Sequence, residues 1–307
     1  MIIARIEGGL GNQMFQYAYG MFLARKHKTT LLLDVSSYED KPQHGYLLDN
    51  FHIEAQIAGE KDAPKIPRRY RTKEARTPWW KDGFGLNSFR RYKEQEFGFL
   101  PAHLEVPNNR YLVGYWQSEK YFPDMRRELL QQFALRHQLS PRSQEVGKSM
   151  RNCNSVALHV RRGDYITSTS AAQIYEHLSI EYYQRSLQEW TKDIQDPRVF
   201  IFSNDIAWCR EQFNLPWQTQ FVDHTNVDTA FEDMWMMLQA SCLIMANSTF
   251  SWWAGWLNQR PDHTVIAPSR WFRPGTLNSD HLLPTNWTVS PVDPLAKSDA
   301  TVSRHAA

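Results

Sequence analysis

The sequence predicts an α/β protein with two domains, each built on a parallel sheet. The chain has 307 residues, which is long for one compact core and suits two domains of about 100–200 residues each. Short β-branched or leucine-rich stretches alternate with helical stretches, the pattern of parallel strands covered by helices on both faces. A polar stretch with a hinge at 140–143 separates two such series. We therefore expect one domain over 1–140, a second over 141–290, and a frayed tail over 291–307.

The N-terminal series begins as one strand–turn–helix–strand unit. Strands are expected at 2–6, 29–35 and 111–114, and helices at 12–26 and 118–133. The stretch from 42 to 107 is rich in Pro and Arg and has no clear period, so it is predicted as loops and short helices.

The C-terminal series is more regular. Its expected strands and helices lie, in order, at 155–160, 180–192, 199–202, 205–213, 219–222, 229–240, 243–246, 249–258 and 264–267. Ligands bind such sheets at the carboxyl ends of the strands, so candidate functional residues are sought where strands end.

Composition excludes several classes of protein. With 35 basic and 33 acidic residues, the charge is too balanced for a typical nucleic-acid binder. Three widely spaced cysteines predict unbonded thiols in a cytoplasmic protein, without a disulfide framework or zinc site. The N-terminus resembles a strand and no signal peptide, and no apolar run reaches the roughly 20 residues of a membrane span. Aromatic residues make up 13% of the chain; core packing accounts for most, with a mild bias toward a carbohydrate ligand.

The strongest motif is His-Val-Arg-Arg-Gly-Asp-Tyr at 159–165, at the end of an expected strand. Neighbouring side chains on a strand point in opposite directions, so one arginine can face a ligand while the other anchors the loop. Guanidinium groups bind phosphate through paired hydrogen bonds. Surface arginines paired with Asp164 are an equally good interpretation of the tripeptide alone.

Three other strand ends carry candidate ligand-binding residues. The turn Gly8-Gly9-Leu10-Gly11-Asn12 could bring backbone N–H groups to an anion, although a tight packing turn fits as well. Ser248-Thr249-Phe250-Ser251 begins a helix, either as an ordinary N-cap or as a phosphate site. Asn204 and Asp205 could contact a nucleobase edge, but helix capping is the favoured interpretation of this pair in isolation.

Several motifs are missing from the sequence. It contains no DxD pair, no HExxH, no Walker A motif and no GxSxG elbow. We therefore expect a reaction that requires no metal, in which arginine and backbone amides stabilise the charge of a departing diphosphate.

Five motifs together resemble glycosyltransferase family 11, the bacterial α-1,2-fucosyltransferases. They are GGLGNQMFQYA at 8–18, GYWQSEKYF at 114–122, HVRRGDY at 159–165, FSND at 202–205 and ANSTFSWW at 246–253. The resemblance implies a GT-B-like fold, with two Rossmann-like domains facing a central cleft. It also implies metal-independent, inverting transfer of L-fucose from GDP-β-L-fucose to the 2-hydroxyl of a terminal β-galactoside, with the acceptor on the N-terminal domain.

The same resemblance implies roles for individual residues. Arg161 corresponds to the β-phosphate clamp, His159 to a guanine or ribose contact, and Asn204 or Asp205 to the guanine contact. Arg162 is expected to be structural and held by Asp164. The remaining donor-binding candidates are Gly9, Gly11, Asn12, Thr249, Phe250 and Ser251. Asp164 and Glu7 are both candidates for the base, and a carboxylate paired with arginine is the poorer one.

Two alternatives and one question of location remain open. The alternatives are a fucosyltransferase of other linkage (α-1,6 or protein O-linked) and a nucleotide-sugar or carbohydrate-binding module without turnover. The expected acceptor is a surface glycan such as a lipid-linked O-antigen repeat, made in the cytoplasm. A basic stretch at 65–73 could touch the inner membrane, although a solvated surface is the favoured interpretation.

Overall fold

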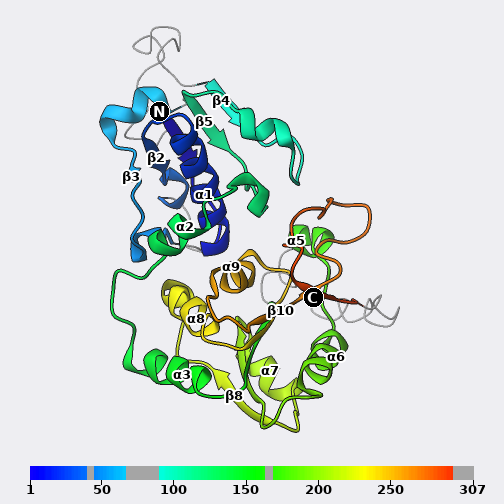
Figure 1. Cartoon of the computed structure of the whole chain (residues 1–307). Coiled ribbons are helices and arrows are strands. Elements are labelled where there is room, and N and C mark those ends of the chain that lie inside the picture. The colour runs from blue at the N-terminus through cyan, green and yellow to red at the C-terminus, as the bar shows by residue number, and fades with distance from the viewer. Residues whose placement is uncertain (40–44, 67–89, 163–168, 293–307) are drawn as a thin grey trace, which may run out of the picture. The chain divides into compact units, whose positions relative to one another are not determined.

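The computed structural model describes residues 1–39, 45–66, 90–162 and 169–292. The chain forms two compact units (Figure 1). Unit 1 comprises Met1–Ser140 together with Thr225–Glu232 and Asp280–Pro284, and unit 2 is the rest of the described chain. Asp164, the tail from 293 onward and most of the basic 65–73 stretch lie outside the described residues.

Unit 1 is built on a five-stranded sheet of parallel strands in the order β3-β2-β1-β5-β4. Helix α1 packs against β1 and β2 and buries most of its length in the core of this unit. The elements are β1 (Ile2–Arg5), α1 (Leu10–Lys26), β2 (Leu31–Asp34), η1 (Ser36–Tyr38), η2 (Leu48–Asn50), β3 (Gln56–Ile57), η3 (Glu60–Lys65), β4 (Arg90–Lys93), η7 (Pro101–Glu105), β5 (Arg110–Val113), η8 (Glu119–Tyr121) and α2 (Arg126–Gln132).

Unit 2 is built on a six-stranded parallel sheet in the order β11-β10-β9-β6-β7-β8. Its elements are α3 (Pro141–Arg151), β6 (Ser155–Val160), α5 (Thr169–Ile174), α6 (Ile180–Thr191), β7 (Arg198–Ser203), α7 (Ile206–Gln212), β8 (Gln218–Val222), α8 (Ala230–Met237), β9 (Cys242–Ile244), α9 (Thr249–Leu257), β10 (Thr264–Pro268) and β11 (Thr288–Ser290). The short helix η9 (Val227–Thr229), which precedes α8, lies in unit 1. The first residues of α8 belong to unit 1.

Helices cover both faces of the unit 2 sheet. Val156, Leu158 and Val160 of β6 share one core cluster with side chains of α6 and α7. Because side chains alternate along a strand, His159 must point to the other face. Its ring lies 5.6 Å from that of Phe250, the second residue of α9. The α9 tryptophans Trp252, Trp253 and Trp256 are buried there with Trp287, so core packing accounts for much of the aromatic content.

The prediction of an α/β fold on parallel sheets is confirmed, but three element predictions are wrong. The helix expected at 118–133 is split into η8 and α2, because Pro123 intervenes and Asp124 has φ = 61°. The expected hinge at 140–143 contains the division between the two units, at Ser140 and Pro141, but most of it is helical because α3 begins at Pro141. The stretch 42–107, predicted as loops and short helices, also contains the strands β3 and β4. The thiols of Cys153, Cys209 and Cys242 are unbonded, as expected.

Candidate active site

Three of the sequence motifs meet at one edge of the unit 2 sheet. Strands β9, β6 and β7 are neighbours, and their carboxyl ends carry the 246–253, 159–165 and 202–205 motifs, respectively. We call this set of strand ends the unit 2 edge. Contacts between the motifs confirm that they converge: His159 touches Phe250, and the backbone N–H of Arg162 donates to Asn204 Oδ1 over 3.0 Å.

Arg162 is anchored by residues that follow β7. Its guanidinium carbon lies 3.9 Å from the centroid of the Trp208 ring, and its Nε lies 3.4 Å from Asp205 Oδ2. The other oxygen of Asp205 accepts from the backbone N–H of Trp208 and so caps α7. The structural role expected for Arg162 therefore has a partner in Asp205, whereas the predicted partner Asp164 lies outside the described residues. This contact was not predicted from the sequence. The only sign of it there is Trp208, placed three residues after the N-cap aspartate Asp205.

Asn204 and Asp205 are thus both occupied by contacts within the protein. Asp205 acts as the helix cap that its position allows, and Asn204 Oδ1 fixes the backbone after β6. The Asn204 side chain is exposed in the structure. Their expected role at the guanine stays a prediction.

His159 is buried beneath this edge. Burial lowers its pKa to about 3, and the positive charge of Arg161 adds to that effect. The imidazole is therefore neutral across the physiological range. Its Nδ1 is buried and accepts or donates no hydrogen bond within the described part of the chain. Arg161 is half-buried and close enough to act electrostatically on His159, which places a persistent positive charge at this edge.

The N-terminus of α9 supplies the third component. Ser248 is its N-cap and accepts from the Phe250 backbone N–H over 3.3 Å. Thr249 and Phe250 are half-buried, whereas Ser251 is fully buried and its hydroxyl lies 3.3 Å from the carbonyl oxygens of Ala246 and Ser248. Thr249 and Phe250 therefore lie nearer the surface than Ser251. A helix N-terminus favours an anion because its first N–H groups carry partial positive charge.

Asn247 fixes two loops behind this helix. Its Nδ2 donates to the carbonyl oxygens of Glu176 and Trp271, each over 2.8 Å, and the side chain is buried. Because both amide hydrogens are used, replacement by Asp would leave two carbonyls unpaired. Asn247 was not among the candidate residues predicted from the sequence. Its position between strand β9 and the N-cap of α9 is one where an asparagine side chain can bind backbone groups of neighbouring loops.

The glycine-rich motif lies in unit 1, at the carboxyl end of β1. Gly8 has φ = 83°, and a Cβ there would lie 2.8 Å from Asn12 Nδ2, so glycine is required. Gly9 is the N-cap of α1 and has open space where a Cβ would be. Gly11 is buried, and Asn12 Oδ1 accepts from Gln117 Nε2 over 2.9 Å, which ties this turn to the end of β5.

Glu7 precedes this turn and is paired with an arginine. Its Oε2 lies 2.8 Å from Arg5 Nε, and both side chains are mostly buried. Its backbone N–H donates to Gln16 Oε1. We call the carboxyl ends of β2, β1, β5 and β4 the unit 1 edge; it contains Glu7, Gly9, Gly11 and Asn12, whereas all other described site candidates lie at the unit 2 edge.

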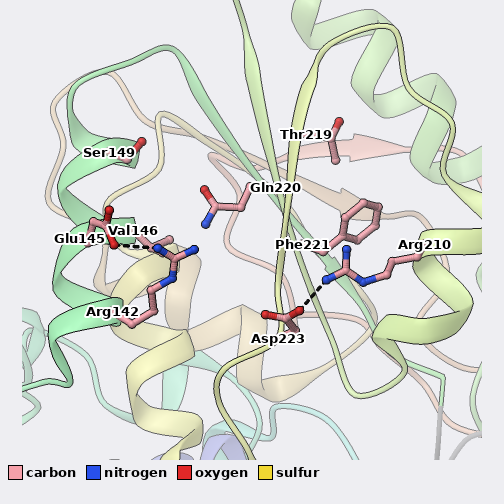
Figure 2. A pocket seen from close by; sticks show the side chains of 9 residues that line it. All are labelled: Arg142, Glu145, Val146, Ser149, Arg210, Thr219, Gln220, Phe221 and Asp223. Carbon is pink, nitrogen blue, oxygen red and sulfur yellow. Dashed lines mark hydrogen bonds and ion pairs between the residues drawn. The ribbon is translucent and has the colours of Figure 1, made fainter.

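A separate cavity of about 420 Å³ opens beside β8, at the lateral edge of the unit 2 sheet (Figure 2). Its two arginines are paired with acidic neighbours: Arg142 with Glu145 over 2.7 Å and Arg210 with Asp223 over 2.5 Å. The cavity therefore has no unbalanced positive charge for a diphosphate. Its lining residues are not among the residues of the unit 2 edge.

Within the described ranges, no group of three or more His, Cys, Asp or Glu side chains is arranged to hold a metal ion. In the same part of the chain, no helix is both long enough and apolar enough to span a bilayer.

Comparison with known proteins gives a consistent result. The model of glycosyl transferase family 11 matches residues 1–289. An α-1,2-colitosyltransferase of Escherichia coli is 30% identical over 94% of this chain and 98% of its own length. The O-antigen biosynthesis glycosyltransferase WbnK of Escherichia coli is 30% identical over 87% of this chain and 93% of its own. A galactoside α-(1,2)-fucosyltransferase 2 of Oryctolagus cuniculus is 26% identical, covering 87% and 73%.

Among solved structures, NodZ α-1,6-fucosyltransferase soaked with GDP-fucose is similar in fold. The match covers 83% of this chain and 91% of that chain with a TM-score of 0.50. Because the identity is only 16%, this match supports the fold alone.

Proposed function

This chain belongs to glycosyltransferase family 11, and on that basis we propose that it transfers L-fucose from GDP-β-L-fucose to the 2-hydroxyl of a terminal β-galactoside, inverting the anomeric centre. The family predicted from the five sequence motifs is confirmed, and with it the prediction of a glycosyltransferase. Relatives named as galactoside α-1,2-fucosyltransferases support the linkage. A relative named for O-antigen biosynthesis supports a surface glycan as the product.

One observation carries the assignment of the donor site: three motifs converge on the unit 2 edge. The charge of Arg161, the N-terminus of α9 and the neutral buried His159 together suit a nucleoside diphosphate. We assign GDP-fucose to this edge, with Arg161 at the β-phosphate and Thr249 and Phe250 at the phosphates. His159 and Asn204 are assigned to the nucleoside. Asp205 and Ser251 are assigned a supporting role, because their side chains contact other groups of the protein and hold the donor-binding residues in place.

The proposed reaction breaks the bond between the fucose anomeric carbon and the β-phosphate oxygen. The electron pair of this bond leaves with GDP, while the acceptor 2-hydroxyl oxygen bonds to the opposite face of the anomeric carbon and loses its proton to a base. Charge grows on the β-phosphate as an oxocarbenium-like centre forms. A positive group placed beforehand at that oxygen lowers the barrier because it binds the transition state more strongly than the ground state.

Glu7 and Asp164 are the two candidates for the base. Glu7 lies at the unit 1 edge in an ion pair with Arg5. Gly9, Gly11 and Asn12 are assigned to the diphosphate from unit 1. We propose that the enzyme works in the cytoplasm on a lipid-linked acceptor and requires no metal ion.

The test is an assay of the purified chain with GDP-fucose and a panel of β-galactosides in the presence of EDTA. The expected product carries fucose on the 2-hydroxyl, established by NMR of the isolated oligosaccharide. Glucosides serve as the matched acceptors without a terminal galactose. Strict dependence on Mn²⁺, or hydrolysis of GDP-fucose without transfer to any galactoside, would rule the proposal out.

GDP-colitose is a second candidate donor, favoured by the relative named as an α-1,2-colitosyltransferase. Colitose differs from L-fucose by the absence of the 3-hydroxyl. A site that hydrogen-bonds this hydroxyl through buried groups rejects the deoxy sugar by about 10⁴-fold, whereas a site that ignores it discriminates little. The ratio of kcat/KM for the two donors on one acceptor therefore decides between them.

A further inference from the structure

The unit 1 edge contains a second feature that the donor assignment does not use. Resting on the proposed function, we propose that the ring of Tyr115 stacks against the terminal galactose of the acceptor, and that Tyr38 and Tyr46 form the wall beside it. All three tyrosines belong to unit 1, and their segments follow the carboxyl ends of β2 and β5.

Tyr115 is distinguished by its exposure. Its side chain is 38% exposed, and among the described residues no other Phe, Tyr or Trp is exposed to this degree. The next residue, Trp116, is buried with its ring 4.3 Å from that of Tyr19 and stacked on Tyr92. Trp116 therefore anchors the turn while Tyr115 is presented to solvent. Tyr115 is thus the described aromatic ring most open to a ligand from solution, and an aromatic ring can pack on the apolar face of a sugar.

The backbone that presents Tyr115 is fixed before any ligand arrives. The carboxylate of Glu94, which follows β4, accepts from the N–H groups of Tyr115 over 2.7 Å and Trp116 over 3.2 Å. A Cβ at Gly114 would lie 2.5 Å from Glu94 Cβ, and Trp116 has φ = 56°. Such a turn loses little conformational freedom when a sugar binds, which favours affinity.

The other two tyrosines are held against the glycine-rich turn. The Tyr38 hydroxyl donates to the Gly8 carbonyl over 2.8 Å, and the Tyr38 and Tyr46 rings lie 6.4 Å apart. Burial raises the pKa of Tyr38, and the charge of Glu7 adds to the shift. The turn that Tyr38 contacts is joined to the segment after β5, which contains Tyr115, by the hydrogen bond from Gln117 Nε2 to Asn12 Oδ1. Tyr115, the tyrosine wall and a candidate base therefore share one part of the unit 1 edge.

Gln13 is the positioning residue for Tyr46. It is fully buried on α1, and its Nε2 donates to the carbonyl oxygens of Gly8 and Gly45 over 3.1 and 2.9 Å. Its Oε1 accepts from the Leu47 N–H over 2.9 Å. These bonds clamp the residues on both sides of Tyr46 to the turn that follows β1.

Galactose suits such a surface for a chemical reason. Its axial 4-hydroxyl leaves the C–H groups of carbons 3, 4 and 5 together on one face of the ring. This apolar face can pack on a phenol ring, while the tyrosine hydroxyls remain as hydrogen-bonding partners for the sugar hydroxyls. The proposed ligand is therefore a β-galactoside, for which lactose is the probe.

Steady-state kinetics with lactose and GDP-fucose test the role of Tyr115. Tyr115→Ala should raise the KM for lactose at least about tenfold, the effect of losing one aromatic contact of about 1.4 kcal/mol. The KM for GDP-fucose should stay within about twofold. Tyr115→Phe, which keeps the ring but lacks the hydroxyl, should raise this KM clearly less than Tyr115→Ala does. Ile57→Ala is the matched control, because Ile57 is 51% exposed in the same unit but lies on β3, which β2 and β1 separate from β5.

The outcomes separate this proposal from the proposed function. An unchanged lactose KM in Tyr115→Ala, or an equal rise in both KM values, overturns the role of Tyr115 while wild-type transfer leaves the function intact. A wild-type protein that transfers to no galactoside overturns the function itself. Thermal unfolding and GDP binding by calorimetry verify that each variant is folded. Should Tyr115→Ala unfold, Tyr115→Leu is assayed in its place, with the same expected and contradicting results.

Discussion

The two adjacent arginines after β6 differ in their surroundings, and this difference separates their roles. The guanidinium of Arg162 stacks on Trp208 and pairs with Asp205, so its charge is already compensated by the protein. The charge of Arg161 instead acts on the buried His159. We therefore assign Arg162 to the scaffold that holds the loop, and we keep Arg161, the residue that the family resemblance places at the β-phosphate, as the phosphate contact.

Substitution of the two arginines should separate these roles. We predict that Arg161→Ala lowers kcat by about 10²–10³-fold, as loss of one charge-stabilising group does, with little change in thermal stability. Arg162→Ala should cost less activity, about tenfold, but should lower the melting temperature because a stacked and paired side chain is removed. Measuring kcat and the melting temperature for both variants checks this. Equal losses of activity would contradict the division of roles.

His159 should leave a signature in the pH dependence of stability. Its pKa is about 3 in the folded chain and about 6.5 in an unfolded one, so between these values the unfolded chain binds more protons. The unfolding free energy of the wild type should therefore fall relative to His159→Gln by about 1.4 kcal/mol for each unit of pH below 6.5. Urea denaturation of the ligand-free protein from pH 5 to 8 measures the difference. His52→Gln, at an exposed position, is the control, and parallel curves for His159→Gln and wild type would be the contradicting result.

At the scale of elements, the sequence predicts the helices and strands that have a strong hydrophobic period. It misses those that form because of their contacts with neighbouring segments. Strands β6, β7 and β9 and helices α1, α6 and α9 are predicted because apolar runs and capping residues mark them. Strand β4 is exposed along most of its length, so no apolar period identifies it; pairing with β5 makes it a strand. Helix α3 has a polar sequence and begins at a proline, which also fits a hinge.

The candidate site divides in the same way. Motif residues at strand ends could be named from the sequence, because a parallel sheet brings those ends to one edge. The partners that fix them could not, since Arg162–Asp205, Glu7–Arg5 and Glu94–Tyr115 depend on side-chain directions and on turns. Exposure of Tyr115 beside a buried Trp116 likewise follows from one turn, which composition cannot show.

A glycine allows helix α3 to pack closely against α8. A Cβ at Gly147 would lie 2.2 Å from Cζ3 of Trp235 on α8. Gly147→Ala should gain about 1 kcal/mol of helix propensity but lose about 1–3 kcal/mol from overpacking, so the net effect is destabilising. Chemical denaturation measures it. Lys148→Ala, at an exposed position on the same helix, should not destabilise. If contact with Trp235 is the cause, adding Trp235→Leu to Gly147→Ala should restore part of the loss.

At the scale of the whole molecule, the two units repeat one plan. Each has a parallel sheet, a turn and a helix after its central strand, and candidate residues at the carboxyl ends of its strands. They differ in the charge of the groups that these edges bury. In unit 2, burial lowers the pKa of His159, and in unit 1, burial raises the pKa of Glu94.

This contrast predicts opposite responses of the two units to pH. Burial raises the pKa of Glu94 to about 7, against the opposing effect of the N–H groups of Tyr115 and Trp116. The folded chain therefore binds more protons than the unfolded one between the unfolded value of 4.5 and 7, and stability is lost as pH rises through this window. Glu94→Gln has no such group, so its unfolding free energy relative to wild type should increase from pH 5 to pH 8. For His159→Gln the relative free energy should decrease over the same interval.

Hydrogen exchange, corrected for intrinsic rates, assigns each effect to β1 and β5 of unit 1 or to β6 and β7 of unit 2. Two differences with the same sign would show that the pKa shifts of these groups do not set the pH response of their units.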